Sequence, residues 1–307
     1  MMYDLIIIGG GPAGVAAGVY AARKKIKTLV IVESFGGQSI VSADVQNWIG
    51  TKSISGLDLA KNLEEHLRAQ EGIEISEGER ANKVLKIDGG FCVETTGGKS
   101  FDAKTVLVAS GSRRRKLDVS GESKLDGRGV AYCSICDAPV FKGKDVAVVG
   151  GGNAGLEAVR DLLPYAARIY LLVRRDVLKG DETTGACIKN DPKVQIIFNA
   201  EIREIMGDDF VTAVLYKDLL SGDVKNISVK GVFVEIGVVP NSELIKDLVQ
   251  VNQMGEIVVD PRTQRASIEG IWAAGDVTDG LYRQNNISAG DALKAVLNIY
   301  SYLNTNK

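Results

Sequence analysis

One glycine-rich pattern occurs twice in this chain of 307 residues, and it constrains the fold more than any other feature. The stretch DLIIIGGGPAGVAAG (4–18) aligns with DVAVVGGGNAGLEAV (145–159), and seven of the fifteen positions are identical. Each copy begins with a short β-branched run, which is typical of a buried parallel strand. The pattern G-x-G-x-x-G follows and predicts a tight turn into a helix. We therefore expect an α/β protein with two Rossmann-like nucleotide-binding domains.

The glycines of each copy serve different purposes. The first permits the tight turn, the second lets a pyrophosphate approach the backbone, and the third lets the helix pack closely on the strand. One copy alone would be weak support, because such turns also have purely structural uses, whereas two copies in the same context favour nucleotide binding. The candidate phosphate-binding residues are Gly9, Gly11, Pro12, Ala13 and Gly14 in the first copy, and Gly150, Gly152, Asn153, Ala154 and Gly155 in the second.

The end of the second strand, about 20 residues beyond the glycines, distinguishes the two sites. In the first copy the strand TLVIVE ends in Glu33, whose carboxylate can accept hydrogen bonds from free ribose hydroxyls but repels a 2′-phosphate. The equivalent position of the second copy holds Arg174, followed by Arg175 and then Lys179. Guanidinium groups suit a 2′-phosphate, although an arginine pair can also be merely solvated. We expect FAD or NAD in the first site and NADPH in the second.

The composition is that of an ordinary globular protein, with 45% apolar residues, 25% charged residues and a net charge of −2. This charge argues against binding to nucleic acid or to anionic membranes. Residues 5–22 carry no charge, but five glycines and Pro12 interrupt the run, which favours strand, turn and helix over a membrane span. The isolated Cys92 and Cys187 do not suggest a disulfide framework. The sequence predicts a soluble cytoplasmic protein without a targeting segment.

A third strand pattern lies near the C-terminus, where GIWAAGDVTDG (270–280) places apolar residues before Gly275 and Asp276. An aspartate there can hold the ribityl chain of a flavin, although Asp after Gly is also common in turns. Together with both glycine motifs and CSICD (133–137), this segment resembles the low-molecular-weight thioredoxin reductases, and equally the C-terminal portion of the alkyl hydroperoxide reductase flavoprotein. The resemblance covers essentially the whole chain. It implies FAD in the first site and NADPH in the second.

The resemblance also implies which residues contact the cofactors. Arg174, Arg175 and Lys179 are implied for NADPH, and a helix is expected to begin near residue 284 with its positive end toward the isoalloxazine. The residues implied for the flavin, besides the first glycine turn and Glu33, are Gly37, Gln38, Asn47, Ala109, Gly111, Gly275, Asp276, Arg283, Gln284 and Asn285. The sequence departs from the family pattern at Asn285, where alanine is usual, and at Lys179, where arginine is usual. It also has Val173 where the family usually has a histidine.

The remaining question is the role of CSIC (133–136). A Cys-x-x-Cys can be half of a zinc site, a redox dithiol or two inert buried thiols. Zinc normally needs four ligands, and the chain adds only two scattered cysteines and His66, which lies in an amphipathic helical pattern typical of the surface. A chain that resembles a flavin- and NADPH-dependent reductase favours a redox dithiol, because a flavin can pass two electrons to a disulfide. No metal site is expected.

The resemblance implies different roles for the residues of this motif. Cys136 is expected to face the flavin, Cys133 to exchange with the disulfide of a partner, and Asp137 to act as general acid. A partly desolvated carboxyl can supply the proton if its pKa is raised. The alternative for Asp137 is a helix N-cap, and one aspartate can serve both purposes.

We expect a discontinuous FAD domain at 1–113 and 242–307, with the NADPH domain at 114–241 inserted and carrying the dithiol. The polar segments 112–122 and 239–243 have the composition of linkers. The nicotinamide and the dithiol must each reach the flavin, and the dithiol must also reach a partner protein. A domain rotation about 112–118 and 239–243 is therefore expected, as in the family. A homodimer is implied by resemblance alone.

The predicted function is that of an NADPH-dependent thioredoxin-disulfide reductase. An alternative is the reductase component of a peroxide-reducing system that uses a separate thioredoxin-like partner, since CDAPVFKGKDVAVVGGGNAG (136–155) is closer to that relative. A further alternative is a non-catalytic flavoprotein that senses redox state.

Overall fold

The computed structural model describes residues 2–42 and 44–305, which divide into two compact units. Unit 1 contains the chain up to Arg113 and again from Val239, and unit 2 runs from Arg114 to Val238. The expected domain boundaries were 113/114 and 241/242, and the compact units divide at 113/114 and 238/239; the assignment of FAD to one unit and of NADPH to the other stays a prediction. The two connecting segments, β7 (Ser112–Arg114) and β16 (Val238–Pro240), pair with each other as a small sheet.

Unit 1 is built on a seven-stranded sheet with the order β3-β2-β1-β6-β5-β4, and β17 pairs with β6. The strands that pair in parallel are β1 (Met2–Gly10), β2 (Thr28–Phe35), β3 (Ile73–Glu77), β6 (Ser100–Val108) and β17 (Ile271–Ala273). A hairpin of β4 (Ala81–Ile87) and β5 (Gly90–Thr95) adds to β6 in antiparallel fashion. The central position of β1 places the first glycine turn in the middle of the sheet.

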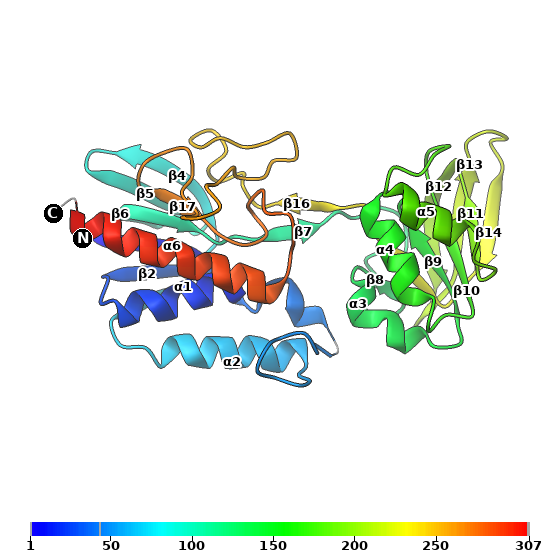
Figure 1. The fold of residues 1–307 in the computed structure, drawn as a ribbon, viewed down its shortest axis with the longest axis horizontal. Coiled ribbons are helices and arrows are strands. Elements are labelled where there is room, and N and C mark those ends of the chain that lie inside the picture. Colours follow the sequence, from blue (N-terminus) through cyan, green and yellow to red (C-terminus); the bar gives the residue numbers. More distant parts are fainter. Residues whose placement is uncertain (1, 43, 306–307) are drawn as a thin grey trace. The chain divides into compact units, whose positions relative to one another are not determined.

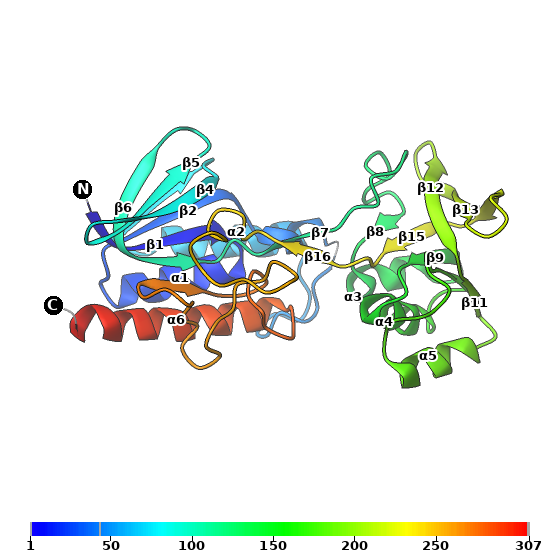
Figure 2. The ribbon, with the colours of Figure 1, turned by 90° about the horizontal axis from the view of Figure 1, so that it is seen from above.

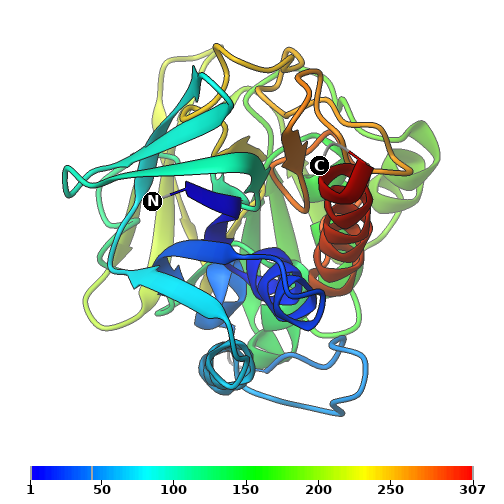
Figure 3. The ribbon, with the colours of Figure 1, turned by 90° about the vertical axis from the view of Figure 1, so that its left-hand side faces the viewer.

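Three helices cover one face of this sheet (Figures 1 and 3). They are α1 (Pro12–Arg23), α2 (Gly56–Arg68) and α6 (Asn285–Thr305), and a short 3-10 helix, η1 (Gly37–Val41), precedes α2. Successive residues of β1 serve both faces: Leu5 and Ile7 pack on the helices, whereas Ile6 and Ile8 pack on the other side. An uncharged run buried on both faces is typical of a parallel strand. The interpretation of residues 5–22 as strand, turn and helix is confirmed.

Unit 2 repeats this plan on a smaller scale. Its five-stranded sheet is parallel throughout, with β11 (Val194–Ile197), β10 (Arg168–Leu172), β9 (Asp145–Val149), β15 (Gly231–Val234) and β8 (Val130–Ala131) in that order. One face carries α3 (Ser134–Asp137), η2 (Ala138–Phe141), α4 (Asn153–Leu162) and α5 (Glu182–Lys189). The other carries the antiparallel sheet β12 (Ala200–Gly207), β13 (Val211–Asp218) and β14 (Val224–Ser228), as Figure 2 shows.

The predicted α/β class with two Rossmann-like halves is therefore confirmed. In each unit a glycine turn leads from a central strand of the sheet, β1 or β9, into a helix packed on that sheet. Over the described residues, the structure contains no helix that is both long and apolar enough to cross a membrane.

Candidate functional site

The glycine turns of both units have nearly the same close contacts. Gly9 has a φ of +125°, and a Cβ atom there would lie 2.2 Å from the carbonyl oxygen of Ala109. A Cβ atom at Gly14 would lie 1.9 Å from the carbonyl oxygen of Gly9. In unit 2, Gly150 has a φ of +135°, and a Cβ atom at Gly155 would lie 1.9 Å from its carbonyl oxygen. Only glycine fits the first and third positions, because any side chain would overlap backbone atoms.

The middle glycine of each turn is different, because the space beside it is open. A Cβ atom at Gly11 would meet nothing closer than the Cα atom of Gly37 at 3.7 Å, and one at Gly152 would meet no atom within 4 Å. Among the described residues no side chain caps the N-terminus of α1 or α4, whereas Ser55 caps α2 and Asp181 caps α5. Two open turns with uncapped helix N-termini fit the pyrophosphates of two dinucleotides.

The residues next to these glycines follow the same plan with different exposure. Pro12 and Ala13 begin α1 and are buried, whereas Asn153 and Ala154 begin α4 and are exposed. The side chain of Asn153 accepts a hydrogen bond from the backbone N–H of Asp181 at 2.7 Å. Asn153 therefore holds the loop that follows β10 against the helix.

The charged residues that distinguish the two sites lie where the alignment of the repeats places them. Glu33 is exposed near the end of β2, with its carboxylate 3.9 Å from the guanidinium of Arg80. Arg174 and Arg175 are exposed just beyond β10. The backbone N–H of Lys179 donates to the carbonyl of Gly151 at 2.7 Å, which brings this loop against the second glycine turn. The two turns thus differ in charge as expected, acidic in unit 1 and basic in unit 2.

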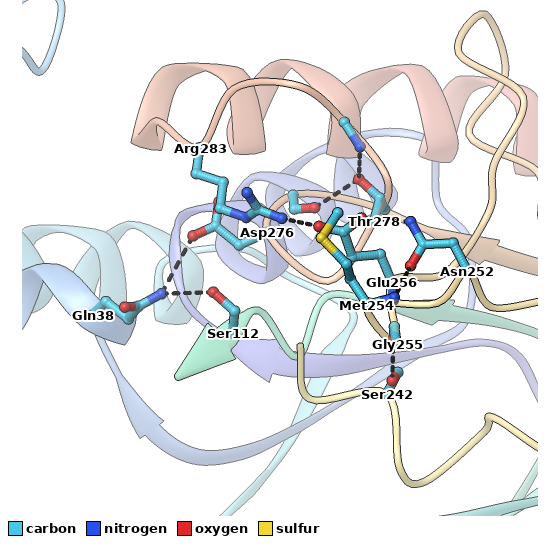
Figure 4. A network of polar contacts seen from close by, with 12 residues as sticks. Gln38, Ser112, Ser242, Asn252, Met254, Gly255, Glu256, Asp276, Thr278 and Arg283 are labelled. Carbon is cyan, nitrogen blue, oxygen red and sulfur yellow. Dashed lines mark hydrogen bonds and ion pairs between the residues drawn. The ribbon is translucent and has the colours of Figure 1, made fainter. Parts of the chain in front are cut away.

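The residues implied for the flavin come from distant parts of the sequence and meet in unit 1 (Figure 4). The side chain of Gln38 donates to Ser112 at 3.0 Å and to Asp276 at 3.3 Å. Asn47 donates to Gln284 at 3.1 Å, and Asn285 donates to the hydroxyl of Ser39 at 2.8 Å.

Three more of the implied residues define the backbone around this network. Gly275 has a φ of +75°, and a Cβ atom there would lie 3.3 Å from that of Ala13. Gly111 also has a positive φ, and no heavy atom lies within 4 Å of the position of its missing Cβ. Ala109 is buried, and its carbonyl oxygen is the atom that a Cβ at Gly9 would overlap. The expected helix is present, because α6 begins at Asn285.

Arg283 also lies beside this network, where it makes an ion pair that the sequence did not suggest. Its guanidinium pairs with Glu256, whose side chain is only 6% exposed and also accepts a hydrogen bond from Asn252 at 2.6 Å (Figure 4). The Nε atom of Arg283 is buried and has no partner among the described residues. A buried donor without a partner is costly, and a bound group that accepts a hydrogen bond from this atom would remove that cost. In the sequence, only the presence of an acidic residue between Gly255 and an apolar run, in MGEIVVD (254–260), could have drawn attention to Glu256.

The two cysteines of CSIC form a disulfide in unit 2, with their Cα atoms 5.4 Å apart. Cys133 immediately precedes α3 and Cys136 lies within it. The hydroxyl of Ser134 donates to Asp161 of α4 at 2.8 Å, which holds the short helix in place. Burial raises the pKa of Asp137 to about 6, so its carboxyl can carry a proton near neutral pH.

A second buried carboxyl lies close to the disulfide, and no motif indicated it. Glu235 directly follows β15 and is 8% exposed. Its pKa is raised to about 7, chiefly by burial, although Arg114 and the backbone N–H of Ser134 oppose the shift. The only local signal was an acidic residue at the end of a fully buried strand.

The other candidate residues take no part in these arrangements. Cys92 is partly buried and Cys187 is exposed, and neither forms a disulfide. His66 is exposed on α2, as expected. Within residues 2–42 and 44–305, no group of three or more His, Cys, Asp or Glu side chains could hold a metal ion.

The chain matches known proteins along almost all of its length. The family model for pyridine nucleotide-disulphide oxidoreductases matches residues 3–292. A Bacillus subtilis protein named NADH dehydrogenase is 41% identical over 301 residues, which are 98% of this chain and 58% of that protein. The F component of alkyl hydroperoxide reductase from Xanthomonas campestris is 41% identical over 304 residues, which are 98% of this chain and 57% of that protein. The chain thus spans less than two thirds of these curated relatives.

A solved structure matches over the full chain. The thioredoxin reductase from Streptococcus pyogenes is 35% identical, with a TM-score of 0.86 and 99% of both chains covered. The resemblance noted in the sequence is therefore confirmed. With two open nucleotide turns, one disulfide and a family match over residues 3–292, this chain belongs to the pyridine nucleotide-disulphide oxidoreductases, a family that implies a flavin and a pyridine nucleotide as cofactors.

Proposed function

We propose that this chain is a thioredoxin-disulfide reductase that uses NADPH and FAD to reduce the disulfide of thioredoxin or of a thioredoxin-like protein. The observation that carries the proposal is the Cys133–Cys136 disulfide beside Asp137, whose pKa is raised to about 6. The same unit contains an open glycine turn beside Arg174 and Arg175. The likeness to a Streptococcus thioredoxin reductase over 99% of both chains supports the choice of substrate.

The residues of each unit have distinct roles in binding. In unit 1 the N-terminus of α1 would hold the FAD pyrophosphate and Glu33 a ribose hydroxyl, with Gln38 and Asp276 beside the ribityl chain. In unit 2 the N-terminus of α4 would hold the NADPH pyrophosphate, and Arg174 and Arg175 the 2′-phosphate. When bound, the flavin supplies hydride acceptance from reduced nicotinamide and transfer of two electrons to a disulfide.

The protein's own chemistry is thiol–disulfide exchange. Two electrons and two protons convert the Cys133–Cys136 disulfide into two thiols. The Cys133 thiolate then attacks the partner's disulfide, forming a mixed disulfide and releasing one partner thiolate, which takes a proton. Cys136 attacks Cys133, re-forms the internal disulfide and releases the second partner thiol. Asp137, whose pKa is raised to about 6 by burial, retains a protonated fraction near neutral pH and supplies a proton to a leaving thiolate.

A second candidate function is the reductase component of a peroxide-reducing system with a separate thioredoxin-like partner. The 41% identity to the F component of alkyl hydroperoxide reductase favours it. The chemistry at Cys133 and Cys136 would be the same, and only the partner would differ. A homodimer, and a rotation of the units about 112–118 and 239–243, remain predictions.

The deciding experiment mixes the FAD-loaded protein with excess NADPH and either an oxidised thioredoxin or an oxidised peroxiredoxin. We expect two new thiols per NADPH oxidised, over many turnovers, with thioredoxin alone sufficient. Little or no turnover with thioredoxin, together with turnover of the peroxiredoxin once its own thioredoxin-like partner is added, would favour the second candidate. No thiols beyond the two of the chain itself would contradict both functions and favour a redox sensor.

A further inference from the structure

Glu201 contacts the arginine pair beyond β10, and no motif in the sequence indicated it. It is the second residue of β12. Its Oε1 atom lies 3.1 Å from an Nη atom of Arg174, and its other oxygen pairs with Arg203. The side chain of Glu201 is 23% exposed, whereas that of Arg174 is 76% exposed. Arg174 therefore has a carboxylate partner in the protein and still presents most of its surface to solvent.

Backbone hydrogen bonds fix this arrangement. The N–H of Ala200 donates to the carbonyl of Val173 at 3.0 Å, and the N–H of Asn199 donates to that of Arg175 at 3.1 Å. The start of β12 is thus joined to the backbone on both sides of Arg174. The backbone of Glu201 is therefore held next to that of Arg174, and its carboxylate lies within reach of the guanidinium.

We propose that Glu201 limits the preference for a 2′-phosphate, because its carboxylate competes with that phosphate for Arg174. Arg203 weakens the competition, since it neutralises part of the same carboxylate. The inference rests on the proposed function, in which Arg174 binds the 2′-phosphate of NADPH. It assigns opposite effects to Glu201 and to the second partner of its carboxylate: removal of Glu201 strengthens binding of a 2′-phosphate, and removal of Arg203 weakens it.

The expected size follows from the exposure of the charges. Partly exposed charge pairs contribute up to about 1 kcal/mol, and salt screens them. We therefore expect changes of about three- to fivefold in affinity at low salt, and smaller changes at about 0.5 M salt. A ligand that lacks the 2′-phosphate should bind all variants alike.

The test compares adenosine 2′,5′-bisphosphate with 5′-AMP by isothermal titration calorimetry on the FAD-loaded protein. Glu201→Gln should bind the bisphosphate about three- to fivefold more tightly, and Arg203→Gln should bind it more weakly by a similar factor. Binding of 5′-AMP should change less than about twofold in both, which also shows that the fold is intact. Arg174→Ala should remove the effect of Glu201→Gln.

The outcomes separate this inference from the proposed function. The inference is wrong if Glu201→Gln leaves both affinities unchanged or changes both by the same factor. It is also wrong if Arg203→Gln changes the affinity for the bisphosphate in the same direction as Glu201→Gln. Either result counts even when the wild type prefers the bisphosphate. If the wild type does not prefer the bisphosphate but Glu201→Gln does, the inference holds and strict use of NADPH fails. If no variant gains affinity for the bisphosphate, the inference is overturned whatever the wild type binds.

Discussion

At the scale of single residues, Glu235 makes the stability of unit 2 depend on pH. Burial raises its pKa to about 7, from the ordinary value of 4.5 that applies in the unfolded chain. The folded state binds the proton more tightly, so this stability is complete below about pH 4.5 and is lost as the pH rises through about 7. At about 1.4 kcal/mol per pKa unit, the loss amounts to about 3 kcal/mol.

Glu235→Gln should remove this dependence, because the amide carries no charge at any pH. The variant should have a higher free energy of unfolding than the wild type at pH 8, and a similar one at pH 4.5. Urea unfolding followed by circular dichroism measures the difference. Asp208→Asn, at a fully exposed side chain, is the matched control and should follow the wild type. A wild-type curve that does not fall between pH 5 and 8 relative to Glu235→Gln would contradict the assignment.

Cys133 and Cys136 should also behave differently. In Cys136→Ser, Cys133 can attack a partner's disulfide but no second thiol resolves the product, so a covalent complex with thioredoxin should accumulate on a non-reducing gel. In Cys133→Ser, much less of this covalent complex should form, because the remaining Cys136 is assigned to the flavin side. The control is the Cys133→Ser, Cys136→Ser double variant, which leaves Cys92 and Cys187 in place and should give no complex. Equal complex in both single variants would mean that the two roles are not separate.

The residues that the sequence did not reveal have a common physical reason. Glu201, Glu235 and Glu256 each act on a group far away along the chain, and only folding brings the two together. Gly9 and Gly14 could be identified because the positive φ of Gly9 and the contact of Gly14 with Gly9 both arise within one turn, where the G-x-G-x-x-G spacing is visible. Local patterns thus predict local geometry, whereas pairing of charges across strands requires the structure.

At the scale of elements, the second glycine turn and α4 separate stability from binding. A Cβ atom at Gly155 would lie 1.9 Å from a carbonyl oxygen, whereas one at Gly152 would meet no atom within 4 Å. The backbone of Gly152, with φ −94° and ψ −175°, is accessible to alanine. Gly155→Ala should therefore destabilise unit 2 by about 1–3 kcal/mol or more.

Gly152→Ala should instead cost under about 1 kcal/mol of stability, since alanine is only a poorer N-cap than glycine. Its methyl group would occupy the space assigned to the pyrophosphate, so the affinity for NADP⁺ should fall about tenfold or more. Thermal unfolding and calorimetric titration of each variant measure the two effects. If Gly152→Ala binds NADP⁺ as well as the wild type, the nucleotide does not approach this turn.

The same elements show how much of the fold could be predicted. The turns at the ends of β1 and β9 follow from apolar runs joined to G-x-G-x-x-G, and the structure has both. The antiparallel sheet β12–β13–β14 was not predicted, because its strands carry no distinctive motif and β14 is mostly exposed. Such a sheet is stabilised mainly by packing on another layer, here the face of the five-stranded sheet, and that partner is not visible in a local window.

At the scale of the whole molecule, each of the two units has its own hydrophobic core among the described residues. Both clusters of buried side chains in unit 1 contain only residues of that unit, and both clusters in unit 2 contain only residues between Leu125 and Val234. Unit 2 is also one continuous segment, whose ends belong to the paired strands β7 and β16. A segment with its own core and adjacent ends has what an independent domain needs.

Residues 114–238 expressed alone should therefore fold, and they should bind NADP⁺ through the N-terminus of α4 without any flavin. Cooperative unfolding by circular dichroism and a calorimetric titration would show both, and Gly155→Ala in the same segment is the control that should lose stability. NADPH should leave the Cys133–Cys136 disulfide of the segment oxidised, because the proposed flavin site lies in unit 1. Without a flavin to accept the hydride, no carrier passes two electrons from NADPH to the disulfide. Dithiothreitol should still reduce it. If the segment stays unfolded, unit 2 depends on unit 1 for its stability. If NADPH alone reduces the disulfide of the segment, the role of the flavin in the proposed reaction is wrong.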